Sequence, residues 1–136
     1  MMFMREFDTE QKKAITKLAY AMMMADEKMR AEEQDIIKAL GHELGVSHLM
    51  QPADFHVPAD LSLFSTPQAK LALMLKLFAI AYSDRQMHPE EAEVLREYSR
   101  RLGIGPRQFD DLTEWGKRHY LLVEQAKAML KAFERG

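Results

Sequence analysis

The sequence predicts an all-α protein, in which two repeated helix–acidic turn–helix hairpins and further C-terminal helices form one helical bundle over residues 1–136. Apolar residues recur every three or four positions through most of the chain, which is the spacing of an amphipathic helix. No segment alternates apolar and polar residues for long enough to indicate a strand. A segment that contains an acidic turn recurs 58 positions later, which indicates a duplicated helical unit.

The first hairpin is expected to begin with a helix over residues 9–25. Asp8 can cap this helix, and Gln11 stands at its third position, where it completes a capping box. The residues expected to face the core are Ile15, Leu18, Ala19, Met22 and Ala25.

The second helix of this hairpin is expected over residues 31–44, after the polar turn 26–30. Gly45 stands where a residue in the left-handed conformation would end the helix. Its apolar stripe consists of Ile36, Ile37, Leu40 and Leu44.

Residues 51–66 predict a long connection without a regular element, because Pro52 and Pro58 interrupt it. The segment is too apolar for a free linker, so we expect it to lie against the bundle. Its apolar side chains are Phe55, Val57, Leu61, Leu63 and Phe64.

The second hairpin repeats the same signals. Thr66 can cap a helix over residues 67–82, and Pro67 stands in its first turn, where proline is tolerated. Its expected core residues are Leu71, Met74, Leu75, Phe78 and Ala81. After a second polar turn, Pro89 opens a helix that ends at Gly103 and carries Val94, Leu95, Tyr98 and Leu102.

A last helical stretch is expected from Pro106 to about residue 133, with a bend or break at Trp115 and Gly116. Apolar and basic side chains are interspersed along its second half. One interpretation is an amphipathic helix docked on the bundle, with its basic side in solvent. The other is a surface for a partner protein or a homodimer, since helices often dock in grooves in this way.

The internal repeat aligns residues 21–46 with residues 79–104 without a gap, and seven of the 26 pairs are identical. The identities fall on the turn, on one helix face and on the helix end, which are the positions that a shared structural unit needs. They are Ala21/Ala79, Asp26/Asp84, Met29/Met87, Glu32/Glu90, Glu33/Glu91, Leu44/Leu102 and Gly45/Gly103.

The two acidic turns are candidate cation sites. Asp26 and Glu33 stand at the end and the start of adjacent helices, so that their carboxylates could converge. Asp84 and Glu91 repeat this arrangement. Hard divalent cations such as Ca²⁺ and Mg²⁺ bind several oxygen ligands of this kind.

A purely structural interpretation of the same turns needs no metal. Glu33 and Glu91 occupy the third helical position if Arg30 and His88 are the N-cap residues. A glutamate at that position can accept a hydrogen bond from the N-cap amide, which is half of a capping box. An EF-hand is excluded, because neither turn has the alternating acidic ligands and the central glycine of that loop.

At these turns the sequence resembles the TerB-like family, which includes the tellurite-resistance protein TerB and the N-terminal region of the co-chaperone DjlA. The matching segments are residues 25–33 and 83–91, each with an aspartate followed seven positions later by a glutamate. The glycine that usually follows the aspartate in this family is Glu27 in one copy and Arg85 in the other.

The resemblance implies an all-α bundle, a bacterial cytoplasmic setting and a role in the response to tellurite, metal or general stress. It also implies a divalent cation held by the acidic turn residues, which carries over to Asp26, Glu33, Asp84 and Glu91.

Composition excludes several other function classes. The net charge of −2 and the pI of about 6.2 argue against a nucleic-acid partner, since such domains usually carry a basic excess. The chain has no cysteine, which excludes thiolate metal sites and cysteine nucleophiles. No apolar run reaches the roughly 18 residues of a membrane span, and the N-terminus does not have the pattern of a signal peptide.

Catalytic motifs are missing from the sequence as well, including a serine elbow and a glycine-rich phosphate loop. We therefore expect a non-enzymatic TerB-like module in the cytoplasm that acts through protein partners, with a cation as its candidate cofactor. The alternative is a metal-dependent enzyme or metal carrier that uses the same carboxylates in an open cleft.

Overall fold

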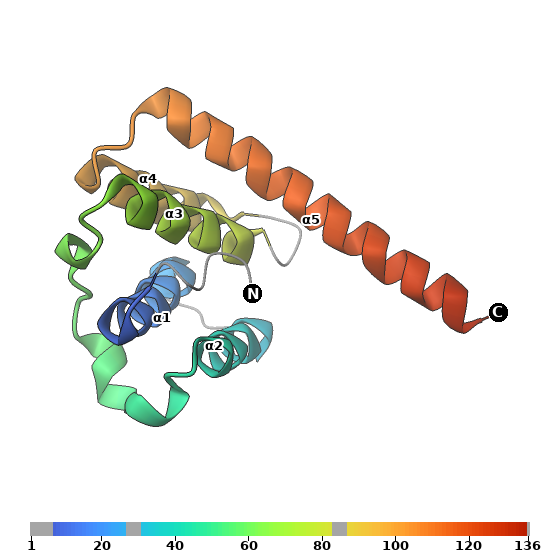
Figure 1. The fold of residues 1–136 in the computed structure, drawn as a ribbon, viewed down its shortest axis with the longest axis horizontal. Coiled ribbons are helices and arrows are strands. Elements are labelled where there is room, and N and C mark those ends of the chain that lie inside the picture. Colours follow the sequence, from blue (N-terminus) through green and yellow to red (C-terminus); the bar gives the residue numbers. More distant parts are fainter. Residues whose placement is uncertain (1–6, 27–30, 83–86, 136) are drawn as a thin grey trace.

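The computed structural model describes residues 7–26, 31–82 and 87–135. These residues form five α-helices and four short 3₁₀ helices and contain no strand, which confirms the all-α prediction (Figure 1). The α-helices are α1 (Thr9–Met23), α2 (Ala31–Leu44), α3 (Pro67–Ala81), α4 (Pro89–Arg101) and α5 (Pro106–Glu134).

The helix ends follow the signals in the sequence. Asp8 and Gln11 form the expected capping box, in which Asp8 Oδ1 accepts from the Gln11 amide at 2.8 Å and Gln11 Oε1 accepts from the Asp8 amide at 2.9 Å. Thr66 Oγ1 accepts from the Ala69 amide at 3.1 Å at the start of α3. Gly45 and Gly103 follow α2 and α4 with φ of 73° and 77°, a conformation that glycine adopts without strain.

The core lies where α1, α3 and α4 meet. The predicted residues Ile15, Met22 and Leu95 are buried there, and the predicted residue Leu40 of α2 is also buried. The two hairpins are not packed symmetrically, because α2 lies chiefly on α1, whereas α5 covers the outer side of α3. Among residues expected in the core, Leu71 is an exception: it is 50% exposed on the face of α3 that borders α5.

The connection between the hairpins packs on the bundle through Leu61 and Phe64, as its composition predicts, whereas Val57 is 57% exposed. It contains three 3₁₀ helices, Ser47–Leu49, Pro52–His56 and Leu61–Leu63, so the expectation that residues 51–66 hold no regular element is wrong. Phe64 is buried, and the Gln11 side chain of α1 donates to the Leu63 carbonyl at 2.8 Å. These contacts bring the chain back alongside α1 before α3 begins.

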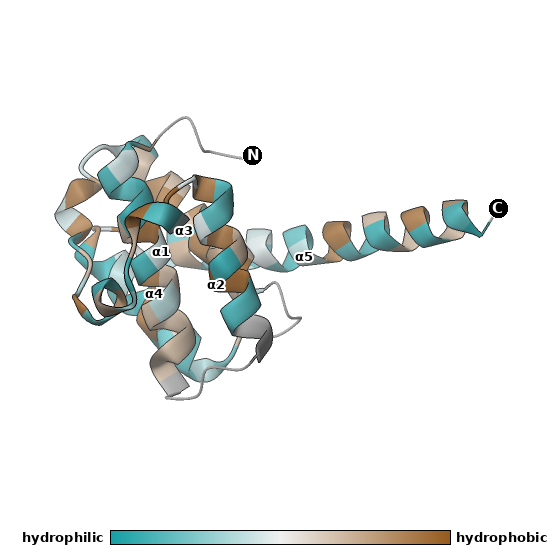
Figure 2. Cartoon of the chain, turned by 90° about the horizontal axis from the view of Figure 1, so that it is seen from below, coloured by the Kyte–Doolittle hydropathy of each residue, from teal (hydrophilic) through white to brown (hydrophobic). Residues whose placement is uncertain are grey.

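The last helix corrects one expectation. α5 runs without interruption for 29 residues, so the bend or break expected at Trp115 and Gly116 is wrong. Gly116 serves close packing instead: it is buried, and a Cβ at this position would lie 2.6 Å from Cδ2 of Tyr82, the residue that caps α3. The second half of α5 extends beyond the other helices (Figures 1 and 2).

Candidate functional site

The first acidic turn lies mostly outside the described residues, which include the backbone of Asp26 and of Glu33 but not residues 27–30. Asp26 ends a 3₁₀ helix, Met24–Asp26, that continues α1, and Glu33 lies in the first turn of α2. Their side chains, and the whole of Asp84 in the second turn, lie outside what the structure describes. The convergence of these carboxylates therefore stays a prediction.

Glu91 is the predicted ligand whose side chain is described. It is 5% exposed, and its Oε1 accepts from the backbone amide of His88 at 3.0 Å. The His88 ring lies beside it, with Nε2 4.0 Å from the same oxygen. His88 is the N-cap of α4, so the glutamate closes the start of this helix, as the structural interpretation of the turn expects.

The side chains that the structure describes contain no group of three or more histidine, aspartate or glutamate residues arranged to hold a metal ion. A site built from two carboxylates and backbone oxygens at the acidic turns would involve residues beyond this description. Within the three described stretches of chain, no helix combines the length and the hydropathy needed to cross a membrane.

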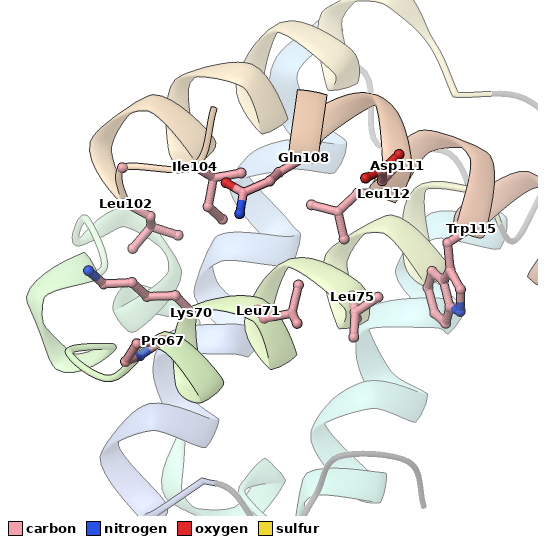
Figure 3. Close-up of a pocket in the computed structure, with 11 residues that line it drawn as sticks. Pro67, Lys70, Leu71, Leu75, Leu102, Ile104, Gln108, Asp111, Leu112 and Trp115 are labelled. Atoms are coloured by element: carbon pink, nitrogen blue, oxygen red, sulfur yellow. The ribbon is translucent and has the colours of Figure 1, made fainter. Parts of the chain in front are cut away.

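A groove of about 630 Å³ lies between α3 and the first half of α5, which we call the α3–α5 groove (Figure 3). Its volume falls in the range typical of binding pockets, about 300–1,000 Å³. Its apolar lining includes Leu71, Leu75, Ile104, Leu112 and Trp115, and its polar lining consists of Lys70, Gln108 and Asp111. Sequence reasoning missed this site, because Leu71 and Leu75 were expected in the core.

The groove exists because α5 is anchored along one side only. Phe109 packs edge-on against Phe78 of α3, with ring centroids 5.3 Å apart, and the Arg96 guanidinium lies 5.4 Å from the centre of the same ring. The contact between Gly116 and Tyr82 holds the middle of the helix close to the end of α3. The flank of α5 next to this anchored side faces Leu71 and Leu75 across an open space (Figure 3).

Beyond Gly116, α5 forms what we call the arm, residues 117–134. Polar and apolar residues are interspersed along it (Figure 2). Its apolar side chains are exposed to an unusual degree, with 64% for Leu122, 72% for Met129 and 87% for Phe133. Exposed apolar surface of this extent typically marks an interaction site. Of the two interpretations of the C-terminal helix, docking on the bundle holds for its first half only.

The groove and the arm share one helix face. From Leu112 the spacing alternates between three and four residues through Trp115, His119, Leu122, Ala126, Met129 and Phe133. We call this line of residues the α5 seam. Its groove end is ordered by the stacking of Trp115 on His119, with ring centroids 5.1 Å apart. An average spacing of 3.5 residues is the pattern of helices that pack along their length in coiled coils.

A second cavity of about 300 Å³ lies between α1, the connection and α4. Lys17, His56 and Arg101 contribute to its lining, and Tyr98 forms part of its wall. The Tyr98 hydroxyl donates to the Leu18 carbonyl at 3.3 Å. Burial raises the pKa of Tyr98 to about 12, against a smaller opposing effect of Arg101, so the neutral phenol is favoured in the folded protein.

Comparison with known proteins supports the resemblance noted in the sequence. Residues 59–114 match the family model described as tellurite resistance protein TerB. The matched segment holds α3, the second acidic turn, α4 and the start of α5, and therefore most of the α3–α5 groove. No curated protein and no solved structure matches the chain. Residues 59–114 are thus similar to the TerB domain, within an all-helical fold.

Proposed function

We propose that this chain, with its TerB-like domain, is a non-enzymatic module of the cellular response to tellurite, metal or general stress, and that it acts by docking a helix of a protein partner in the α3–α5 groove. The observation that carries the proposal is the groove itself, where an apolar lining between two helices is left open to solvent. The stress response is inferred from the TerB-like domain.

The chemistry of the groove suits a helix better than a small polar substrate. Leu71 is 50% exposed, and the half-buried Leu75 and Trp115 continue the apolar surface along the groove, with the buried Leu112 at its base. An amphipathic partner helix would cover this surface with residues spaced by three and four. Lys70 and Asp111 stand at the rim with opposite charges, which favours one direction of the bound helix.

A metal-dependent enzyme is the second candidate, and the described residues favour it less. Such an enzyme needs ligands with open coordination positions in a cleft. Glu91 is buried and closes the start of α4, and the lining of the α3–α5 groove does not include it. In the proposed function, the cation predicted for Asp26, Glu33, Asp84 and Glu91 has a structural or regulatory role and takes part in no reaction.

The experiment expresses two leucine variants separately in cells that lack the native chain. The cells are then challenged with tellurite or metal salts. Leu71→Glu places a charge in the groove, whereas Leu49→Glu alters a similarly exposed leucine, 43% exposed, in the 3₁₀ helix Ser47–Leu49. We expect Leu71→Glu to lower the affinity for co-purifying protein at least about tenfold and to abolish the protection of the cells. A tenfold loss corresponds to a binding free energy of only about 1.4 kcal/mol. Leu49→Glu should retain both.

Far-UV circular dichroism of both variants establishes that they are folded. Equal capture of protein and equal survival with Leu71→Glu and Leu49→Glu would refute the groove as the docking site. Protection that depends on Asp26 and Asp84 but not on Leu71 would favour the metal-dependent alternative instead.

A further inference from the structure

The arm is a helix whose apolar seam has no cover within the described chain. Leu122, Met129 and Phe133 on the seam are each more than 60% exposed. The seam meets the groove at Trp115, and Leu112, which is 4% exposed, lies at the base of the groove, so each copy carries an exposed apolar helix next to an apolar groove. A surface that carries both parts is self-complementary, which is the requirement for a two-fold symmetric interface.

Antiparallel pairing of two α5 helices matches these parts. With the symmetry axis midway between His119 and Leu122, Leu112 of each copy lies level with Met129 of the other. Trp115 then lies level with Ala126, so the largest seam residue meets the smallest. Alternation of large and small residues across a helix pair lets the side chains interdigitate.

Charge favours the same direction. Residues 106–116 of α5 carry three acidic side chains and one basic, whereas residues 117–135 carry five basic and two acidic. Antiparallel pairing brings the acidic half of one helix beside the basic half of the other. Parallel pairing would bring like charges together along the whole length, which is unfavourable.

The groove accommodates the end of the arm in this arrangement. Leu71 and Leu75 of α3 face the groove side of α5, next to Gln108 and Leu112 (Figure 3). The positions of the arm that lie level with Gln108 and Leu112 are Phe133 and Met129, the two most exposed large apolar side chains. Each arm would therefore fill the groove of its neighbour.

We propose that the partner of the α3–α5 groove is a second copy of this chain, and that the protein is an antiparallel homodimer in which the two α5 seams pair and each arm lies in the other copy's groove. This inference rests on the proposed function in taking the groove as a helix-docking site. It adds the identity of the partner and the direction of the bound helix.

The first test is the solution mass of the full chain by sedimentation equilibrium, at concentrations from below one to several tens of micromolar. We expect a dimer of twice the chain mass of 15.8 kDa. Leu122→Glu, on the seam, should shift the protein to monomer. Its matched control is Leu121→Glu, because Leu121 is equally exposed, at 62% against 64%, but lies off the seam.

The leucine pair separates a specific seam from general stickiness of the arm. Dimerisation that survives in Leu121→Glu and is lost in Leu122→Glu supports the proposal. A wild-type protein that is monomeric throughout the concentration range overturns it, and so does equal loss of dimer in both variants.

The second test reports the direction of pairing and uses the absence of native cysteine. Arg107→Cys and Glu134→Cys are both exposed, lie off the seam and are separated by about 40 Å along α5, at about 1.5 Å per residue. After equal mixing and exchange, a short bismaleimide should join Arg107→Cys to Glu134→Cys. Cross-links of each variant with itself would indicate parallel pairing and overturn the proposal.

The two proposals fail differently. A monomeric chain whose Leu71→Glu variant still loses a captured protein and stress protection would refute the homodimer and leave the groove as the docking site of another partner. The other outcome is that both Leu71→Glu and Leu122→Glu dissociate the dimer in solution, but neither substitution alters the survival of stressed cells. This outcome would support the homodimer and refute the proposed role of the groove in stress protection.

Discussion

Gly116 lies directly against the aromatic ring of Tyr82, so closely that a Cβ on the glycine would be 2.6 Å from Cδ2 and 2.9 Å from Cε2 of that ring. Tyr82 is 7% exposed and caps α3, so its ring has little room to move aside. The pair fixes how closely α5 approaches α3 and therefore one end of the groove.

Gly116→Ala should destabilise the protein although alanine favours helix. The gain from replacing a mid-helix glycine is about 0.5–1 kcal/mol, whereas overpacking a tight contact costs about 1–3 kcal/mol. We expect a net loss of free energy of unfolding in urea denaturation followed by circular dichroism. Gly105→Ala shows the effect of a Cβ without a clash, because a Cβ there meets no atom within 4 Å, but it also replaces the N-cap of α5, so its own loss of stability reports the cap. A Gly116→Ala variant more stable than wild type would show that the contact relaxes at no cost.

Glu91→Ala should lower stability by about 1 kcal/mol or more, because it removes a cap and leaves the His88 amide without its acceptor. Glu91→Gln keeps an acceptor oxygen and should lie close to wild type. Glu90→Ala in the same turn is exposed and should change the free energy of unfolding by less than about 0.5 kcal/mol.

These denaturation curves are measured with a chelator present, so that a cation cannot contribute. If Glu91→Ala is as stable as wild type under these conditions, and only the stabilisation by added divalent cation is lost, then Glu91 is a ligand and not a cap.

The predicted cation sites are tested by isothermal titration of the metal-free chain with Ca²⁺, Mg²⁺, Mn²⁺ and Zn²⁺. The prediction expects micromolar binding of one of these ions, lost in the Asp26→Asn/Asp84→Asn double variant. The reason is that carboxylate ligands supply the charge that hard cations require. Absence of heat with every ion, from a protein as stable as its variant, would leave the two turns as helix-capping structures.

Tyr98 should make stability fall at high pH. Its folded-state pKa is raised from 10.0 to about 12 by burial, so the neutral phenol is favoured in the native state. The contribution of this pKa shift to the free energy of unfolding is complete below about pH 10 and is lost as the pH rises toward 12. The largest loss that the shift allows is about 2–3 kcal/mol.

Urea denaturation between pH 9 and pH 11.5 measures this loss, with Tyr98→Phe as the comparison. The variant loses the hydroxyl bond to Leu18 and should be less stable at pH 9, but its stability should fall less steeply. Burial also raises the pKa of Tyr82, which contributes a slope that both proteins share. Equal slopes in the two proteins would mean that Tyr98 ionises without cost to the fold.

Local signals in the sequence predicted the helices well, because caps and stops depend on residues only a few positions apart. Asp8 with Gln11, Thr66, Gly45 and Gly103 each have the role that their residue type and position indicate. The hydrogen bond from the His88 amide to Glu91 could also be predicted from position alone, because Glu91 is three residues after His88.

The groove could not be predicted in the same way. Leu71 has the spacing of a core residue, and only the placement of α5 decides that it borders an open space. Gly116 resembles a helix breaker until its neighbour Tyr82 is known. The amphipathic pattern of the arm indicates that an apolar face exists, but a pattern within one chain does not specify what covers that face.

Trp115 is the only tryptophan in the chain, and it lies half-buried in the groove beside His119. The intrinsic fluorescence of the protein on excitation at the indole band therefore comes from the proposed docking surface. A helix that enters the groove displaces water from this indole and shifts its emission to shorter wavelength, whether that helix belongs to a second copy or to another protein. The native chain thus carries its own optical reporter of occupancy, without any attached dye.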